Sequence, residues 1–177
     1  MKKFILAAIV AVSAVAANAQ TWAGGSLGFG TSHVNGSETT TKTFNLRPEV
    51  GMSISDNVDV AIALGYDHAN AATAVKNAWT INPYVRYAFV KAGDFSAFVD
   101  GGLGYTTTHT NGFDKNLNAV GVNVTPGIAY AVSPKVTLVS HLGDGLYYNH
   151  TWQDSYHKNA FGLDLFNAIS FGAYVSF

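Results

Sequence analysis

The sequence predicts an all-β fold, an eight-stranded antiparallel up-and-down transmembrane β-barrel, on three observations. Apolar residues recur at every second position over most of the chain after Thr21. Only 12% of the 177 residues are charged, about half the share found in a soluble domain. The connections between the alternating segments are by turns short and long. These features indicate a sheet whose apolar face does not meet water.

The N-terminus has the pattern of a secretory signal peptide. A basic start, Met1-Lys2-Lys3, precedes an apolar run rich in small residues, and Ala17-Asn18-Ala19 fits a small-x-small cleavage site. The run is too short for a membrane helix, which needs about 20 apolar residues. We expect cleavage before Gln20, so that residues 1–19 are the signal peptide and residues 20–177 form one outer-membrane β-barrel domain.

Eight segments are expected to form strands, in chain order. The first is weak, and the seventh is spoiled by Ser140 and by the Gly143-Asp144-Gly145 interruption; the other six alternate clearly. The segments are residues 23–29, 44–54, 58–67, 79–89, 95–105, 118–130, 136–142 and 161–177.

The connections are expected to place short turns at one rim and long polar loops at the other. The short ones are residues 55–57, 91–94 and 131–135, and the long ones are residues 31–42, 68–76, 106–116 and 148–159. Two of the long ones contain Asn-Gly turn dipeptides, Asn35-Gly36 and Asn111-Gly112. This alternation, with strands of about ten residues, fits a bilayer-spanning barrel in which every backbone polar group is paired.

The two faces of the strands indicate which side meets lipid. The face opposite the apolar residues carries mainly Gly, Ala, Ser, Thr and Asn, which suit the cramped interior of an eight-stranded barrel. Aromatic residues on the apolar face gather at the strand ends, as expected for two membrane-interface belts. The belt residues are Phe44, Tyr66, Trp79, Tyr105 and Phe161 beside the long loops, and Tyr87, Phe89, Phe95, Tyr130 and Phe177 at the other end.

These features carry a resemblance to a known family. The signal peptide, Pro48-Glu49-Val50-Gly51 leading into Ser55-Asp56-Asn57, and the closing strand Phe171-Gly-Ala-Tyr-Val-Ser-Phe177 resemble small outer-membrane β-barrels of the OmpA/OmpX type. The resemblance implies the cell outer membrane, outer-membrane lipid as surroundings, and an assembly machinery that reads the C-terminal strand. It specifies architecture well and activity poorly.

Three prolines fall inside expected strands, where the missing N–H removes a ladder hydrogen bond. Pro48, Pro83 and Pro126 all lie on the lipid-facing side of strands that run from a long loop to a short turn. We expect a repeated bulge or kink at these positions.

Five charged residues are expected inside the barrel: Arg47, Glu49, Asp59, Arg86 and Asp100. Unpaired buried charges would cost several kcal/mol each, so we expect an interior ion-pair network that plugs the barrel. The alternative is a narrow ion-conducting pore along the same charges, and we favour the plug because eight strands leave no open lumen.

Other residues suggest chemistry only weakly. Five of the six histidines fall in the long loops, and His150, Asp154 and His157 are a candidate metal set, although ordinary polar loop residues explain them better. Ser140 and His141 point to opposite faces of one strand, so they cannot act together as nucleophile and base. We therefore expect no metal, no cofactor and no catalytic residue.

The expected function is that of a non-enzymatic structural protein, or of a scaffold whose long loops bind an extracellular partner or mediate adhesion. The absence of a basic run excludes nucleic acid as a partner. Three alternatives stay open: a lipid-active outer-membrane enzyme that modifies lipid A, a narrow pore, and a secreted soluble barrel that holds an apolar ligand.

Overall fold

The computed structural model describes residues 20–33, 40–71, 74–112 and 114–177, so the expected signal peptide lies outside the described residues. The described chain forms eight β-strands. They are β1 (Thr21–His33), β2 (Thr40–Ser55), β3 (Val58–Ala71), β4 (Ala74–Ala92), β5 (Phe95–Thr110), β6 (Leu117–Ser133), β7 (Val136–Gln153) and β8 (Tyr156–Ser176).

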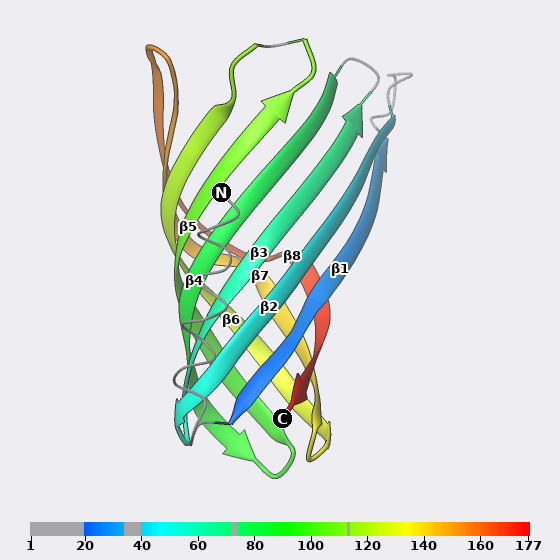
Figure 1. Cartoon of the computed structure of the whole chain (residues 1–177), viewed down its shortest axis with the longest axis vertical. Coiled ribbons are helices and arrows are strands. Elements are labelled where there is room, and N and C mark those ends of the chain that lie inside the picture. Colours follow the sequence, from blue (N-terminus) through cyan, green and yellow to red (C-terminus); the bar gives the residue numbers. More distant parts are fainter. Residues whose placement is uncertain (1–19, 34–39, 72–73, 113) are drawn as a thin grey trace.

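The strands close into a barrel in which each strand pairs antiparallel with its sequence neighbours and β1 pairs with β8 (Figure 1). The predicted eight-stranded antiparallel up-and-down barrel is therefore confirmed. The turns at the lower end of Figure 1, β2–β3, β4–β5 and β6–β7, are the short ones expected from the sequence. Within the described part of the chain, no helix is long and apolar enough to cross a membrane.

The strands at the other end are longer than the sequence predicts. Residues 106–110 continue β5 and residues 148–153 continue β7, and the second of these hairpins turns only at Asp154-Ser155. The expectation of long loops at 68–76, 106–116 and 148–159 is wrong in this respect, since β3 runs to Ala71 and β4 begins at Ala74. Polar Thr, Asn and His residues continue the strand ladder there, because backbone pairing and cross-strand side-chain contacts do not require an apolar face.

The apolar face points outward, as predicted. Leu64, Val85, Val122 and Val124 are all more than two-fifths exposed, whereas the ionised Arg86 is only 6% exposed. A soluble barrel would show the reverse distribution. The broad outer band of Val, Leu, Ile and aromatic side chains is the surface that a bilayer covers.

The three strand prolines each interrupt the ladder with the following strand, but only one of them shifts the register. No pairs are formed at Pro48 with β3 or at Pro83 with β5, yet the register is the same on both sides of each gap. At Pro126 the register between β6 and β7 shifts between Val124 and Gly127. The expected repeated bulge is thus present only at Pro126.

Candidate functional site in the barrel interior

The centre of the interior is an ion pair between adjacent strands. Arg86 on β4 and Asp100 on β5 are direct partners in the register. The Nε and Nη2 atoms of Arg86 donate to the two carboxylate oxygens of Asp100 at 2.8 and 2.7 Å. Both residues are buried, so this two-pronged pairing compensates charges that have lost water.

Two more charged or titratable groups join this pair from other strands. His141 on β7 places its Nε2 atom 2.8 Å from Asp100 Oδ2. On the other side, Arg86 Nη2 donates to the Tyr174 hydroxyl at 3.4 Å, and that hydroxyl donates to Glu49 Oε2 at 2.9 Å. The polar chain from His141 to Glu49 therefore crosses the barrel from β7 through β5 and β4 to β8 and β2.

Tyr84 on β4 is the second hydrogen-bond donor to Glu49. The hydroxyl of Tyr84 donates to the same Oε2 atom at 2.6 Å. Two phenol donors on one carboxylate oxygen compensate the buried charge of Glu49 without a direct cation, because hydrogen bonds to a charged acceptor are stronger than neutral ones.

Aromatic rings enclose the Arg86 guanidinium. Its carbon atom lies 4.0 Å from the centre of the Phe98 ring and 5.3 to 5.8 Å from the rings of Tyr174, Tyr84 and Trp22, which is cation–π geometry. We call the set Trp22, Glu49, Tyr84, Arg86, Phe98, Asp100, His141 and Tyr174 the interior plug.

Glycines on neighbouring strands make room for the plug rings. A side chain at Gly51 would meet the Trp22 ring, and one at Gly127 would meet the Phe98 ring. These two glycines face inward and allow a large ring to lie flat against the backbone of the next strand. The predicted small-residue interior is therefore the space into which the aromatic plug fits.

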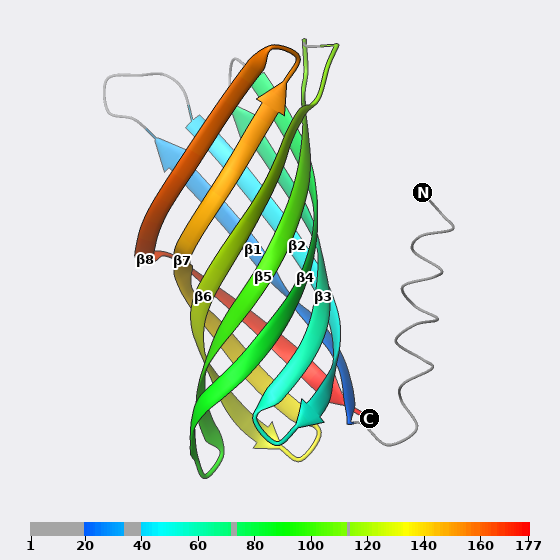
Figure 2. The same ribbon diagram turned by 90° about the vertical axis from the view of Figure 1, so that its left-hand side faces the viewer.

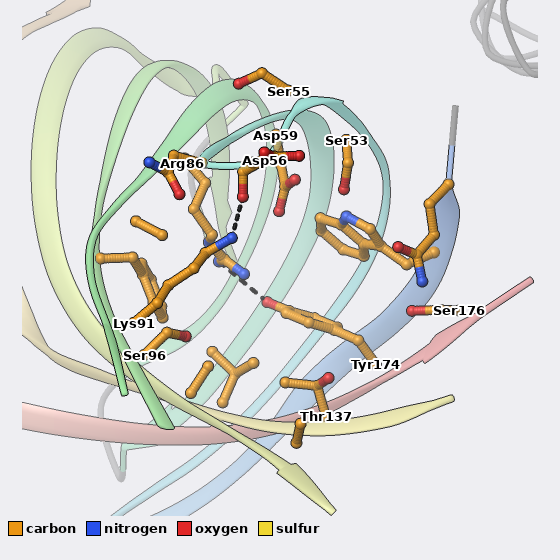
Figure 3. A pocket seen from close by; sticks show the side chains of 18 of the residues that line it. Ser53, Ser55, Asp56, Asp59, Arg86, Lys91, Ser96, Thr137, Tyr174 and Ser176 are labelled. Carbon is orange, nitrogen blue, oxygen red and sulfur yellow. Dashed lines mark hydrogen bonds between the residues drawn. The ribbon is translucent and has the colours of Figure 1, made fainter. Parts of the chain in front are cut away.

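Below the plug, at the short-turn end, the interior widens into a cavity of about 730 Å³ (Figure 3). Its walls are polar, with Ser53, Ser55, Asp59 and Ser96 among the lining residues, and Arg86 stands at its inner end. In Figure 3, Lys91 reaches across it and donates through Nζ to the backbone oxygen of Asp56. The cavity ends at the plug, where Arg86 and Tyr174 meet.

The structure brings together three of the five inward charges that the sequence singles out. Glu49, Arg86 and Asp100 belong to the plug, as described. Asp59 is half-buried and lines the cavity, and Arg47 is exposed inside the upper barrel. Among the described residues, no ion pair includes Arg47 or Asp59. The expected network thus contains fewer charges and more aromatic hydroxyls than the sequence suggests.

All ten expected belt residues lie on the outward face at the two ends of the apolar band. At the upper end, ring contacts run from Phe29 to Phe44 at 5.3 Å between centroids, on to Tyr66 at 6.5 Å, and on to Trp79 at 4.7 Å. The row continues across four strands, β1 to β4. At the lower end, Tyr87, Phe89, Phe95, Tyr130 and Phe177 are exposed on the same outward face.

Above the upper belt, the same three-residue arrangement occurs in each of two hairpins, and we call it the Tyr–His–Asn clamp. On β3 and β4, Asn77 Oδ1 accepts a hydrogen bond from the Tyr66 hydroxyl at 2.9 Å and lies 2.8 Å from His68 Nδ1. An amide oxygen only accepts, so the clamp requires the proton on Nδ1. His68 and Asn77 are register partners, so the clamp fixes the hairpin beyond the apolar band.

The same clamp recurs on β7 and β8. Asn159 Oδ1 accepts from the Tyr148 hydroxyl at 3.1 Å and lies 2.7 Å from His150 Nδ1. β5 and β6 are joined by the tyrosine–asparagine part of this arrangement, in which the Tyr105 hydroxyl donates to Asn118 Oδ1 at 3.0 Å. These contacts explain why residues expected in loops form strands.

The histidines expected in loops lie on these strand extensions. His150 stacks on His157 with 5.6 Å between ring centroids, and on Trp152 at 5.7 Å. The described residues contain no group of three or more His, Asp or Glu side chains arranged to hold a metal ion, so His150, Asp154 and His157 do not form one. Asp154 instead pairs with Lys115 at 2.6 Å on the exposed surface.

His141 faces the interior and belongs to the plug, whereas Ser140 is its neighbour on β7 and pairs in register with Phe171, an outward residue. No described hydrogen bond joins the His141 ring to a hydroxyl nucleophile; its contacts are with Asp100 and Arg86.

An outward apolar band with aromatic side chains at both ends, a polar interior and closed antiparallel strands define a transmembrane β-barrel. The sequence matches the model of the outer membrane protein beta-barrel domain over residues 4–177, and the chain belongs to that family.

A solved structure of low sequence identity has the same fold. Neisserial surface protein A, from Neisseria, superposes with a TM-score of 0.54 at 20% identity, covering 90% of this chain and 96% of that chain. The outer membrane protein W of E. coli gives a TM-score of 0.49 at 15% identity, covering 90% of this chain and 98% of the other. A comparison with curated protein sequences found no match.

Sequence reasoning placed the charges of the plug but missed its rings and His141. Tyr84 and Phe98 are large aromatic residues on strand faces that otherwise carry small or polar residues. This exception to the pattern was the sequence feature that could have identified them as part of the plug. For His141 there was no such signal, because its partner Asp100 is 41 residues away in the sequence. Only the closed sheet brings the two together.

Proposed function

We propose that this chain is a sealed, non-enzymatic outer-membrane barrel that presents its extended hairpins to a partner outside the cell. The observation that carries the proposal is the interior plug, in which the Arg86–Asp100 pair and four aromatic rings fill the barrel at one level. A filled cross-section supports a scaffold rather than a conduit.

The partner would contact the clamped hairpins. They carry hydroxyl, imidazole, amide and aromatic groups on a preorganised backbone, which is the mixture that reduces the entropy lost on binding. The belts would contact outer-membrane lipid. The assembly machinery would recognise the closing strand, in which Phe171, Val175 and Phe177 share the outward face.

Planar-bilayer recording tests the seal. The wild-type barrel should give no steady conductance, whereas a variant with Arg86→Ala and Phe98→Ala should conduct, because it loses the central cation and the ring beneath it. A large, steady conductance of the wild-type protein would reject the plug.

Hairpin replacement tests the binding role. Exchange of residues 111–116 for a two-residue Asn-Gly turn should abolish adhesion of expressing cells to the partner surface while heat-modifiable gel mobility is retained. Mass analysis of lipid A from the same cells should show no gained or lost acyl chain. A change in acylation would replace this proposal with a lipid-active enzyme.

A further inference from the structure

A pocket of about 520 Å³ lies at the upper end of the barrel, between residues 114–116 and the tip of the β7–β8 hairpin. Figure 2 shows the β5–β6 and β7–β8 hairpins side by side at that end, the second of them in orange. Register pairs between β6 and β7 continue up to Asn118↔Trp152, and both of these residues line the pocket. Its volume is in the range of about 300 to 1,000 Å³ that small-molecule sites occupy.

Trp152 supplies the aromatic wall of this pocket. Its ring packs against Tyr105 on β5, with 6.3 Å between the ring centroids, and stacks with His150 on its own strand at 5.7 Å. His150 stacks in turn on His157 of β8 at 5.6 Å. Rings from β5, β7 and β8 therefore hold the indole in one orientation, and a ring that is already ordered loses little entropy when a ligand packs on it.

Two asparagines line the pocket beside the indole, and hydrogen bonds hold both of them. Asn118 Oδ1 accepts from the Tyr105 hydroxyl at 3.0 Å, and Asn116 Oδ1 lies 3.0 Å from His109 Nδ1. A side-chain amide has two N–H donors and an oxygen with two lone pairs, so each contact uses only part of its capacity. Both asparagines can therefore donate to, or accept from, the hydroxyl groups of a ligand.

The rim of the pocket is an ion pair that joins the two hairpins. Asp154 Oδ1 accepts from Lys115 Nζ at 2.6 Å, and Gln153 Nε2 donates to the Lys115 backbone oxygen at 2.7 Å. Asp154 has a φ of +49°, in the left-handed region where glycine is the least strained residue. The turn thus carries a carboxylate at a position where glycine would suit the backbone better, and this carboxylate lines the pocket.

The charges that line the pocket favour a neutral ligand over a sulfated or phosphorylated one. Two carboxylates, Asp114 and Asp154, and one cation, Lys115, face it. Because Lys115 is paired with Asp154, the pocket carries the one remaining negative charge of Asp114, and an anionic ligand would meet a charge of its own sign. Hydroxyl groups, in contrast, can donate to these carboxylates without any charge of their own.

A pyranose sugar matches this combination of groups, because it has a face of C–H groups that packs on an aromatic ring and a rim of hydroxyls that both donate and accept. We propose that the pocket, which we call the tip site, binds hexose units of a neutral glycan carried by the partner outside the cell. The C–H face packs on Trp152, and the hydroxyls bond to the two asparagines and to Asp154. The side chains of the tip site that the argument uses are Lys115, Asn116, Asn118, Trp152, Gln153 and Asp154.

The height of the tip site favours a glycan of the partner over a sugar of the surrounding membrane. Tyr148 is the register partner of the belt residue Phe161, and Trp152 lies four residues beyond it, about 13 Å farther along the strand. Asp154 belongs to the turn itself, so the rim of the site is where an approaching surface first meets the hairpin. The inference rests on the proposed binding role of the hairpins and names the chemistry that they recognise.

An array of neutral and sulfated oligosaccharides, probed with the folded full-length barrel in detergent micelles, tests the tip site. The wild-type protein should bind neutral hexose-containing oligosaccharides. Trp152→Ala should weaken this binding about tenfold or more because the stacking surface is lost, and Trp152→Phe should retain part of it. The matched control is Tyr156→Ala, which removes an exposed ring of the same hairpin outside the lining of the site, and should leave binding unchanged.

Three results of the array would overturn the proposal. They are the absence of binding to every neutral oligosaccharide, binding confined to the sulfated ones, and equal binding by the wild-type protein and the Trp152→Ala variant. Heat-modifiable gel mobility, measured on the same samples, shows that each variant is folded.

Asp154→Gly separates the carboxylate from the turn that carries it. Glycine adopts the positive φ of this position easily, so folding should be unaffected. Binding of the neutral oligosaccharide selected on the array should weaken about tenfold or more, because the sugar hydroxyls lose a charged acceptor. Unchanged binding by the folded variant would contradict the proposed arrangement.

Adhesion assays distinguish this inference from the proposed function. Adhesion of cells that express the wild-type protein should fall when the partner surface is treated with glycosidases or when the selected oligosaccharide is added in excess. If exchange of residues 111–116 abolishes adhesion but glycosidase treatment and Trp152→Ala do not reduce it, the glycan is rejected and the binding role of the hairpins survives. If the array shows tryptophan-dependent sugar binding but the cells do not adhere, the sugar site is supported and the adhesion role is rejected.

Discussion

Arg86 and Asp100 stand directly opposite each other on β4 and β5, and two hydrogen bonds of 2.8 and 2.7 Å join the guanidinium to the carboxylate. Because the sheet register fixes both backbones, the pair is held by the strands themselves. This single cross-strand contact anchors the other groups of the plug: His141 binds its anionic end, and Tyr174 binds its cationic end.

Asp100→Asn should destabilise the barrel by about 3 kcal/mol or more, because it leaves a buried guanidinium without a counter-charge. Urea unfolding of the protein in lipid vesicles, followed by tryptophan fluorescence, measures the change. Asp59→Asn makes the same chemical change at a half-buried carboxylate outside the described ion pairs, and should shift stability by less than about 1 kcal/mol. A similar loss of stability in the two variants would mean that the pairing of Asp100 with Arg86 adds no stability beyond that of an ordinary carboxylate.

Gly145→Ala should impair folding strongly. The residue has a positive φ, and the new methyl group would overlap the Val124 carbonyl oxygen, which belongs to the backbone and cannot turn aside. Gly101→Ala is the control, since a Cβ there meets nothing within 4 Å. The fraction of heat-modifiable protein after refolding gives the comparison, and a normally folding Gly145 variant would contradict the register shift between β7 and β8 at this residue.

Single-tryptophan variants should report the orientation of the wall. Trp79 is 62% exposed on the outward belt, so lipids brominated on the upper acyl chain should quench its fluorescence. Trp22 is buried inside the barrel and should not be quenched. Trp152 lies four residues beyond Tyr148, about 13 Å farther along the strand, and should also escape. Strong quenching of Trp22 would reverse the assignment of inside and outside.

Asn159→Leu should loosen the upper β7–β8 hairpin, because one oxygen accepts from both Tyr148 and His150. Hydrogen exchange of the backbone amides from Thr151 to His157 should become about tenfold faster or more. Tyr148→Phe removes only one of the two contacts and should have a smaller effect. Unchanged protection in both variants would show that the backbone ladder alone maintains the extension.

The sequence predicts the fold correctly where the residues within a single strand are enough to define its pattern. A period of two, small residues on one face, and aromatic residues at the ends of the other give strand number, closure and orientation from local pattern, as residues 79–89 show clearly. The same reasoning failed for residues 148–159. Their polar composition resembles a loop, and the Asn159 clamp that holds them as strands joins residues nine and eleven positions apart.

By itself, the sequence determined that this chain forms an eight-stranded barrel with its apolar face toward lipid and its charges inside, because each strand must alternate to separate the two environments. Only the tertiary structure decided which charges meet: Arg86 binds Asp100, Glu49 is compensated by two tyrosines, and Arg47 lies in the upper interior outside the described ion pairs. The reason is geometric. Contacts across a barrel depend on the register of every strand between them, and one shift, such as that beside Pro126, changes which residues face each other.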